Sequence, residues 1–374
     1  MAGISRRSLL AAGALAALPG RAFAGGLHAL DHAIEDGWIT TAGTDAGFAA
    51  VAVDGDFAAA ERAASPDRLH GIEPSPTGPL AVAVGRRPGH VAIVFDRRHG
   101  GEAARFAPGA GRVFSGHGRF TPDGALFLTN EIERPAGGPM PTMGRGVVAV
   151  RRADAGFGIV AEWPSGGDGP HDLMRSGAAL MIANGGVEPN TPEAGDAEAT
   201  GSSITLLDPA TGAAIGEGRL SADLASLSLR HLDRDGRGGT VVAAQELLKD
   251  GVARPLLFSI GPTGALAPFD APENAWRALR GYVGSVAYDR SGRFVACASP
   301  RGGRVSVWQA DGRYLGFVPL NDGCGLAAGP EASTFVATSG YGEVVRIAAA
   351  RDGVAIVARR TGGPRYDNHM VALG

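Results

Sequence analysis

A recurring phrase constrains the fold of this chain more than any other feature. In each copy, a histidine or another small polar residue is followed four to seven residues later by a tight turn and then a short apolar segment. The residues that begin these phrases are His70, His117, His171, His231, Ser285 and Cys324, and successive members lie 39 to 60 residues apart. This spacing matches the length of one four-stranded blade of a β-propeller.

A seventh phrase stands at the end of the chain. The sequence Asp-Asn-His at residues 367–369 resembles the other six, but only five residues follow it, which is too few for a blade. Apolar segments at residues 37–42, 47–53 and 57–62 can supply three further strands. We therefore predict one domain over residues 25–374, a seven-bladed β-propeller closed by N-terminal outer strands and a C-terminal inner strand.

The composition favours an all-β chain. Glycine accounts for 59 of 374 residues, and short runs of Val, Ala, Leu and Phe are bounded by Asp-Gly, Ser-Gly and Gly-Gly turns. No long amphipathic helix is predicted. A β-sandwich with a second domain, or a ring of six or eight blades, is the alternative; the sandwich explains the strands but not their period.

The first 24 residues read as an export signal. The sequence SRRSLL at residues 5–10 is a twin-arginine phrase, a modest apolar run follows, and AFA at residues 22–24 provides a small-residue cleavage site. We expect a twin-arginine signal peptide over residues 1–24 and a periplasmic mature protein, with an ordinary secretory signal as the alternative. The net charge of −3 does not suggest nucleic acid or an anionic membrane as a partner. No segment is long and apolar enough for a membrane span, and we expect a monomer.

The recurring position should form a ring at the hub, because the innermost strand of each propeller blade runs beside the central channel. Five of the nine histidines occupy it. Imidazole suits Fe, Cu, Zn and Ni, and clustered imidazoles repel one another when protonated, so a bound cation gives the arrangement a purpose. We predict an Fe or Cu site with ligands among His70, His117, His171, His231, Cys324 and His369, whose affinity falls as pH drops through about 6.5. The alternative for each histidine is a buried hydrogen bond to a neighbouring blade.

Residues after the second strand of each blade should gather at the same mouth. We predict that a ligand or cofactor there contacts Arg86, Arg87, Asn130, Glu131, Asn184, Gln245, Glu246, Arg301 and Tyr341. Glu131 and Glu246 could act as a general acid/base pair or form salt bridges with Arg86, Arg87 or Arg301. Whether the chain is an enzyme stays open, and so does a disulfide between its two cysteines, Cys297 and Cys324.

Several phrases also carry a family resemblance. They are GRRPG at 85–89, GHG at 116–118, GPH at 169–171, ANGG at 183–186, LSLRH at 227–231, SPRGG at 299–303, DGCG at 322–325, TSG at 338–340 and DNH at 367–369. In these phrases the chain resembles a bacterial family of exported propeller-like proteins known as domain of unknown function 1513. The segment 188–200 departs from the family, since it is acidic and lacks the arginine that relatives often carry there.

The resemblance implies a role in iron handling without an established activity. Such proteins look like members of iron-responsive gene clusters, beside imelysin-type proteins and a di-haem peroxidase-like protein. Three function classes follow: a metal-binding propeller, a metal-free platform that docks an imelysin-like or haem-protein partner, and a lactonase-like hydrolase or lyase.

Overall fold

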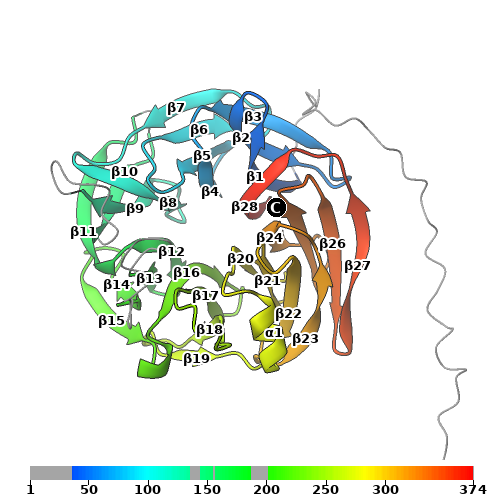
Figure 1. Cartoon of the computed structure of the whole chain (residues 1–374). Coiled ribbons are helices and arrows are strands. Elements are labelled where there is room, and N and C mark those ends of the chain that lie inside the picture. The colour runs from blue at the N-terminus through cyan, green and yellow to red at the C-terminus, as the bar shows by residue number, and fades with distance from the viewer. Residues whose placement is uncertain (1–35, 135–143, 155, 187–200, 374) are drawn as a thin grey trace, which may run out of the picture.

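The computed structural model describes residues 36–134, 144–154, 156–186 and 201–373. In this part of the chain, seven four-stranded antiparallel sheets stand around a central axis, with one strand of each nearest the axis (Figure 1). Helical structure is limited there to α1 (Glu273–Ala278) and the short 3₁₀ helix η2 (Ala222–Leu224). The predicted seven-bladed propeller is confirmed.

The first three sheets, written from the innermost strand outward, use the N-terminal part of the chain and its last strand. They are β28 (Arg365–Leu373), β1 (Gly37–Thr44), β2 (Gly47–Val53) and β3 (Ala59–Ser65); β4 (Leu69–Pro74), β5 (Leu80–Gly85), β6 (Ala92–Asp96) and β7 (Glu102–Phe106); and β8 (Arg112–Phe120), β9 (Leu126–Glu133), β10 (Arg145–Arg152) and β11 (Ile159–Asp168).

The other four sheets follow in chain order. They are β12 (Pro170–Ser176), β13 (Ala179–Asn184), β14 (Ser203–Leu207) and β15 (Ala214–Arg219); β16 (Leu227–Arg234), β17 (Thr240–Glu246), β18 (Leu257–Ile260) and β19 (Leu266–Pro268); β20 (Ser285–Tyr288), β21 (Phe294–Ser299), β22 (Arg304–Gln309) and β23 (Tyr314–Pro319); and β24 (Gly323–Ala328), β25 (Thr334–Ser339), β26 (Val344–Ala350) and β27 (Gly353–Arg360).

The two ends of the described chain close the ring as predicted. β28 pairs antiparallel with β1, from Gly37 opposite Leu373 to Gly43 opposite Arg365, and Figure 1 shows these blue and red strands side by side. β3 begins at residue 59, two residues later than predicted. The strand starts later because residues 54–58 form a turn, in which the Asp54 carboxylate accepts the N–H groups of residues 56 and 58.

The hydrophobic core lies between neighbouring blades. One buried cluster joins Val82 and Val94 of one blade to Phe114 and Phe127 of the next. Burial of each such side chain contributes about 1.5–3 kcal/mol, so every blade is stabilised mainly by its neighbours. Among the described residues, no helix has the length and hydropathy needed to span a membrane. The expected signal peptide lies outside the described residues.

Candidate metal centre

The inner strands share an irregularity at the recurring position. In β4, β8, β12, β16, β24 and β28, the pairing with the neighbouring strand shifts register at the segment that holds the ring residue. In β8, for example, three residues (115–117) separate the paired residues Phe114 and Gly118, whereas only Asn130 separates their partners. Bulges of this kind redirect side chains. Ser285 is the exception, since β20 pairs without a shift.

The structure places all five ring histidines together at the hub. Centroids of contacting rings lie 4.5 to 6.2 Å apart. Their nitrogens form two triads, each with ligand atoms within 4.8 Å of one another: His70, His117 and His171, and His117, His231 and His369. Two nitrogens on one metal at 2.0–2.2 Å are at most about 4.4 Å apart. The 4.8 Å limit of each triad is slightly larger than this, so small shifts of the rings would bring three nitrogens onto one metal, and His117 belongs to both triads.

Glycines next to the histidines allow this close approach. A Cβ atom on Gly116, whose φ is +107°, would lie 2.6 Å from Cδ2 of His70. A Cβ atom on Gly71 would lie 2.6 Å from the carbonyl oxygen of Gly116 and 2.9 Å from Nδ1 of His117. Any larger residue at either position would force the rings apart.

Burial keeps the histidine cluster neutral. It is the largest cause that lowers the pKa of all five imidazoles well below their usual value, and the other histidines add to the effect for His70, His171, His231 and His369. Six buried ring nitrogens make no hydrogen bond within the described part of the chain: Nδ1 of His70, Nε2 of His171, and both nitrogens of His117 and His231. Of these, only Nδ1 of His117 lies beside a carboxylate, that of Asp172. Neutral imidazoles with unengaged nitrogens are the form that binds metal.

The carboxylate of Asp172 lies next to the imidazole ring of His117. Its Oδ1 lies 3.3 Å from Nδ1 of His117 and 3.3 Å from Nη2 of Arg119, while its oxygens accept the N–H groups of Leu173 and Leu232 at 2.8 and 3.0 Å. A carboxylate beside one ring nitrogen orients an imidazole and makes the other nitrogen a better ligand. Sequence reasoning missed Asp172, whose only signal was its place directly after a ring histidine.

Ser285 and Arg230 support two other rings. Ser285 Oγ accepts the N–H group of His369 at 3.2 Å and lies 3.5 Å from Nδ1 of that ring. Nη1 of Arg230 lies 3.3 Å from Nδ1 of His171. His369 itself has a φ of +71°, a left-handed conformation that is unusual for histidine. Arg230 was not among the predicted site residues.

Cys324 occupies the ring position of β24 but belongs to neither triad. Its Sγ points at the carbonyl oxygens of Tyr366 and Thr338, at 3.3 and 3.6 Å. Burial raises the pKa of this thiol, which favours the protonated form over the thiolate that binds metals. Cys297 is also buried, and neither cysteine forms a disulfide.

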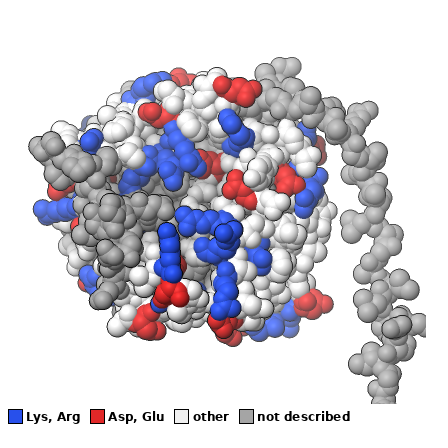
Figure 2. Space-filling view, viewed as in Figure 1, with Lys and Arg blue, Asp and Glu red and all other residues white. Residues whose placement is uncertain are grey.

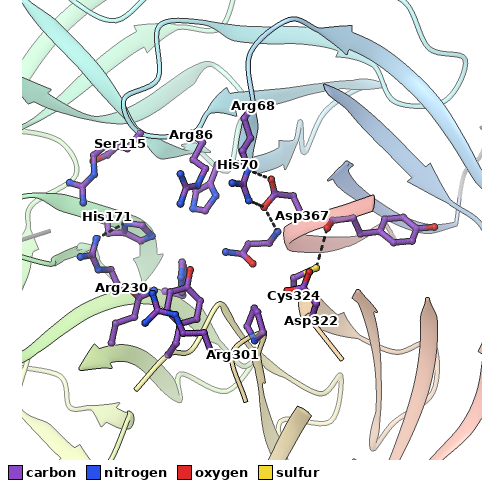
Figure 3. A pocket seen from close by; sticks show the side chains of 17 residues that line it. Arg68, His70, Arg86, Ser115, His171, Arg230, Arg301, Asp322, Cys324 and Asp367 are labelled. Atoms are coloured by element: carbon purple, nitrogen blue, oxygen red, sulfur yellow. Dashed lines mark hydrogen bonds and ion pairs between the residues drawn. The ribbon is translucent and has the colours of Figure 1, made fainter. Parts of the chain in front are cut away.

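One side of the histidine cluster opens into a chamber of about 330 Å³, which we call the arginine chamber. His70, His171 and His231 are among its lining residues, and the first two are labelled in Figure 3. Its charged residues are Arg68, Arg86, Arg87, Arg230, Arg301, Asp322 and Asp367. Of the nine predicted mouth residues, Arg86, Arg87, Gln245 and Arg301 line this chamber.

The two glutamates predicted at the mouth lie elsewhere. Glu131 is fully buried and pairs with Arg151 and Arg112, at 2.7 and 3.2 Å. Glu246 pairs with Arg254 at 3.0 Å. Neither lines the arginine chamber, and the salt-bridge partners expected from the sequence were wrong. Alternate residues of a strand face opposite sides of its sheet, and Glu131 lies on the face that also carries Arg112 and Arg151.

The other three predicted mouth residues are also outside the arginine chamber. The Asn184 amide joins two blades, since it accepts from Ser165 Oγ at 2.9 Å and donates to Thr205 Oγ1 at 3.0 Å. Asn130 is fully buried. Tyr341 is 75% exposed and lines a separate surface hollow that also includes Arg301.

A second chamber of about 400 Å³ lies on the other side of the cluster and is lined by His117, His231 and His369. Its charged residues are Glu73, Asp172, Asp233, Asp235, Asp289, Arg119, Arg234 and Arg290. Burial raises the pKa of Glu73 to about 7 and that of Asp233 to about 6. The cluster thus separates a basic chamber from one richer in carboxylates.

Fold and site together define a class: a seven-bladed β-propeller with a buried, neutral histidine cluster at its hub. Within that class, the chain belongs to the family described as "Protein of unknown function (DUF1513)", whose model matches residues 63–373. The family resemblance drawn from the recurring phrases is thereby confirmed.

Comparison with solved structures supports the fold. The chain is similar to Kuenenia stuttgartiensis hydrazine synthase with a TM-score of 0.58 and 14% identity, over 90% of this chain and 99% of that one. At this identity, the likeness shows a common fold alone. No curated protein matches the chain in sequence.

Proposed function

We propose that this protein binds a transition-metal ion through the histidine triads at its hub. The observation that carries the proposal is the convergence of five neutral imidazoles, with the nitrogens of each triad within 4.8 Å of one another. Imidazole is a good ligand for Fe, Cu, Zn and Ni. Three protein nitrogens leave room for a further ligand on the metal.

A purely structural role explains the cluster less well. Buried histidines that only hold blades together normally have hydrogen-bond partners, because an unpaired buried polar group costs about 1–3 kcal/mol. Here, five ring nitrogens of His70, His117, His171 and His231 have neither a hydrogen-bond partner nor a facing carboxylate among the described residues. A metal ion would satisfy several of them at once. The carboxylate of Asp172 beside His117 fits the same role.

We further propose that the metal is iron or copper and that the protein works in the periplasm. Support for iron comes from the family resemblance, which implies iron-responsive gene clusters; the nitrogen ligands themselves suit either metal. Support for export comes from Arg6 and Arg7 in the twin-arginine phrase. An imelysin-like or di-haem peroxidase-like protein is the partner that this setting suggests.

Elemental analysis tests the metal proposal. The full chain is expressed in a bacterium with a twin-arginine pathway, purified from the periplasm without a histidine tag, and analysed by mass spectrometry. Near-stoichiometric Fe or Cu is expected. Traces only would overturn the proposal in favour of a metal-free docking platform, and stoichiometric Ca or Mg would favour a lactonase-like enzyme.

Export has its own test. Replacing Arg6 and Arg7 by lysine should retain the precursor in the cytoplasm, as fractionation and immunoblotting would show. Normal periplasmic amounts of this variant would point to the general secretory route instead.

A further inference from the structure

The surface hollow that contains Tyr341 is lined mainly by positive charge, and we call it the basic hollow. Its volume is about 780 Å³, and its charged lining residues are Arg280, Arg301, Arg304 and Asp322. Arg280 and Arg301 are exposed, and Arg304 is half-buried. None of these three arginines forms an ion pair with a carboxylate in the part of the chain that the structure describes. The hollow therefore carries positive charge that the protein does not itself neutralise.

Aromatic and backbone contacts hold these arginines in place. The guanidinium of Arg301 stacks on the ring of Tyr282 at 4.5 Å, and that of Arg304 stacks on Phe317 at 4.1 Å. Nη1 of Arg280 lies 3.5 Å from the carbonyl oxygen of Arg301. Stacking uses the face of a guanidinium and leaves N–H groups at its edge available. The positive groups are thus ordered before any ligand arrives, which lowers the entropy cost of binding.

Arg280 occupies a position that usually takes glycine. It directly follows Leu279, the C-terminal cap of α1, and has a φ of +53°. Glycine is common at this position because a residue with a Cβ atom is strained in the left-handed conformation. Backbone strain of this kind concentrates at binding sites, where the side chain serves a purpose other than stability. The strain at Arg280 is a second observation, independent of charge, that points to a ligand here.

A second surface hollow, of about 380 Å³, adjoins the basic hollow and shares Arg280 and Arg301 with it. It adds Lys249 and the side chain of Val252, which is 57% exposed. Figure 2, which views the ring from the side on which α1 lies, shows Lys and Arg side chains gathered near the centre of this face. The two hollows together present shared arginines with an exposed nonpolar or aromatic side chain in each.

We infer that the basic hollow is a docking site for an acidic segment of a partner protein. Guanidinium groups present paired N–H donors that match carboxylate oxygens. Tyr341, which is 75% exposed, and Val252 add the nonpolar contacts typical of protein interfaces, which a small anion or a nucleic acid backbone would not use. The net charge of −3 disfavours a long polyanion, whereas screening beyond about 8 Å lets a short segment respond to the local charge. This docking goes beyond the proposed metal function and does not depend on it.

Fluorescence anisotropy with a labelled oligoglutamate peptide, at about 0.15 M salt, tests the docking site. Wild type should bind the peptide saturably. Arg280→Gly removes one guanidinium and relieves the left-handed strain, so it should weaken binding by about fivefold while the melting temperature stays equal or rises. Arg280→Gly/Arg301→Gln should weaken binding at least about tenfold. The control Arg237→Gln removes an exposed positive charge between β16 and β17, outside both hollows, and should bind within about twofold of wild type.

Three results would overturn the inference. The first is no saturable binding of the peptide to folded wild type. The second is equal weakening in Arg237→Gln and the double variant, which would assign the effect to net charge. The third is unchanged peptide binding in the double variant together with lost binding to phosphatidylglycerol vesicles, which would assign the hollow to a lipid surface. All variants keep the ring histidines, so their metal content should equal that of wild type, and failure here leaves the metal proposal standing.

Discussion

The Nε2 atoms of His70 and His369 lie 3.2 Å apart, although 299 residues separate the two histidines in the chain. One belongs to β4 and the other to β28, the strand that closes the ring against β1. The strand that closes the propeller therefore also completes the histidine cluster. A ligand that binds only the assembled cluster should stabilise the closed ring.

His117→Ala should remove the metal more completely than substitution of any other ring histidine. His117 is shared by both triads, so its loss leaves two histidines in each. We expect metal content at background level by elemental analysis and no rise in melting temperature on addition of metal. His99→Ala is the matched control, because the side chain of His99 is 69% exposed beside Asp96. Retention of metal by His117→Ala would exclude the proposed centre.

The pH dependence of metal binding should differ from that of ordinary histidines. The sequence alone placed the loss of affinity at pH about 6.5. In the folded protein, burial lowers the pKa of all five imidazoles, so protons compete with the metal only at lower pH. Affinity measured with a chromophoric competitor should stay nearly constant from pH 7.5 to 6.5 and fall below that. A steep fall already within this range would contradict the shift.

Asp172→Asn should weaken metal binding by about 10- to 100-fold, because it removes the carboxylate beside Nδ1 of His117. The amide oxygen can accept only one of the N–H groups of Leu173 and Leu232, which two different carboxylate oxygens accept in the wild type, so some loss of thermal stability should accompany the loss of affinity. Asp233→Asn is the control: Asp233 lines the same chamber, but its carboxylate accepts the N–H of Tyr288 at 2.6 Å. Equal weakening in both variants would assign the effect to the charge of the chamber instead of the orientation of His117.

Glu73 should make the protein less stable at alkaline pH. Burial raises the pKa of its carboxyl from 4.5 to about 7. The protonated form is favoured by folding, so this contribution is complete below pH 4.5 and is lost as pH rises through 7. Glu73→Gln mimics the protonated form, and urea unfolding should show it roughly 2 kcal/mol more stable than wild type at pH 8 but little changed at pH 5. A difference that does not vary with pH would contradict this assignment.

The propeller and its ring of histidines could be predicted from the sequence because the turns that mark the blades are local motifs that recur along the chain. Turns such as Asp123-Gly124 mark each blade: Asp123 Oδ1 accepts the N–H of Ala125, and Gly124 takes a φ of +69°. An offset of four to seven residues before such turns placed four of the histidines on the inner strands, and the likeness of its phrase to the others placed His369. Ring closure was predicted because the phrase at residues 367–369 has too few residues after it to form a blade of its own.

The surroundings of the ring could not be read in the same way, because they depend on register and on contacts between blades. The bulge at residues 115–117 is visible only once β8 and β9 are paired. Asp172 reaches His117 from the next blade, and Glu131 reaches Arg112 and Arg151 within its own. Residue type indicated that such groups would be paired, but not with which partner.

The left-handed backbone of His369 gives a last test, because it separates strain from ligand loss. At a φ of +71°, a residue with a Cβ atom costs roughly 1–2 kcal/mol more than glycine. His369→Gly should therefore be about 1 kcal/mol more stable than His369→Ala in metal-free urea unfolding, although both lose the same ligand. His70 is not among the residues with positive φ, so there the order should reverse, with His70→Ala the more stable by about 0.5–1 kcal/mol. If alanine is favoured at both positions, the bulge of β28 does not hold His369 under strain.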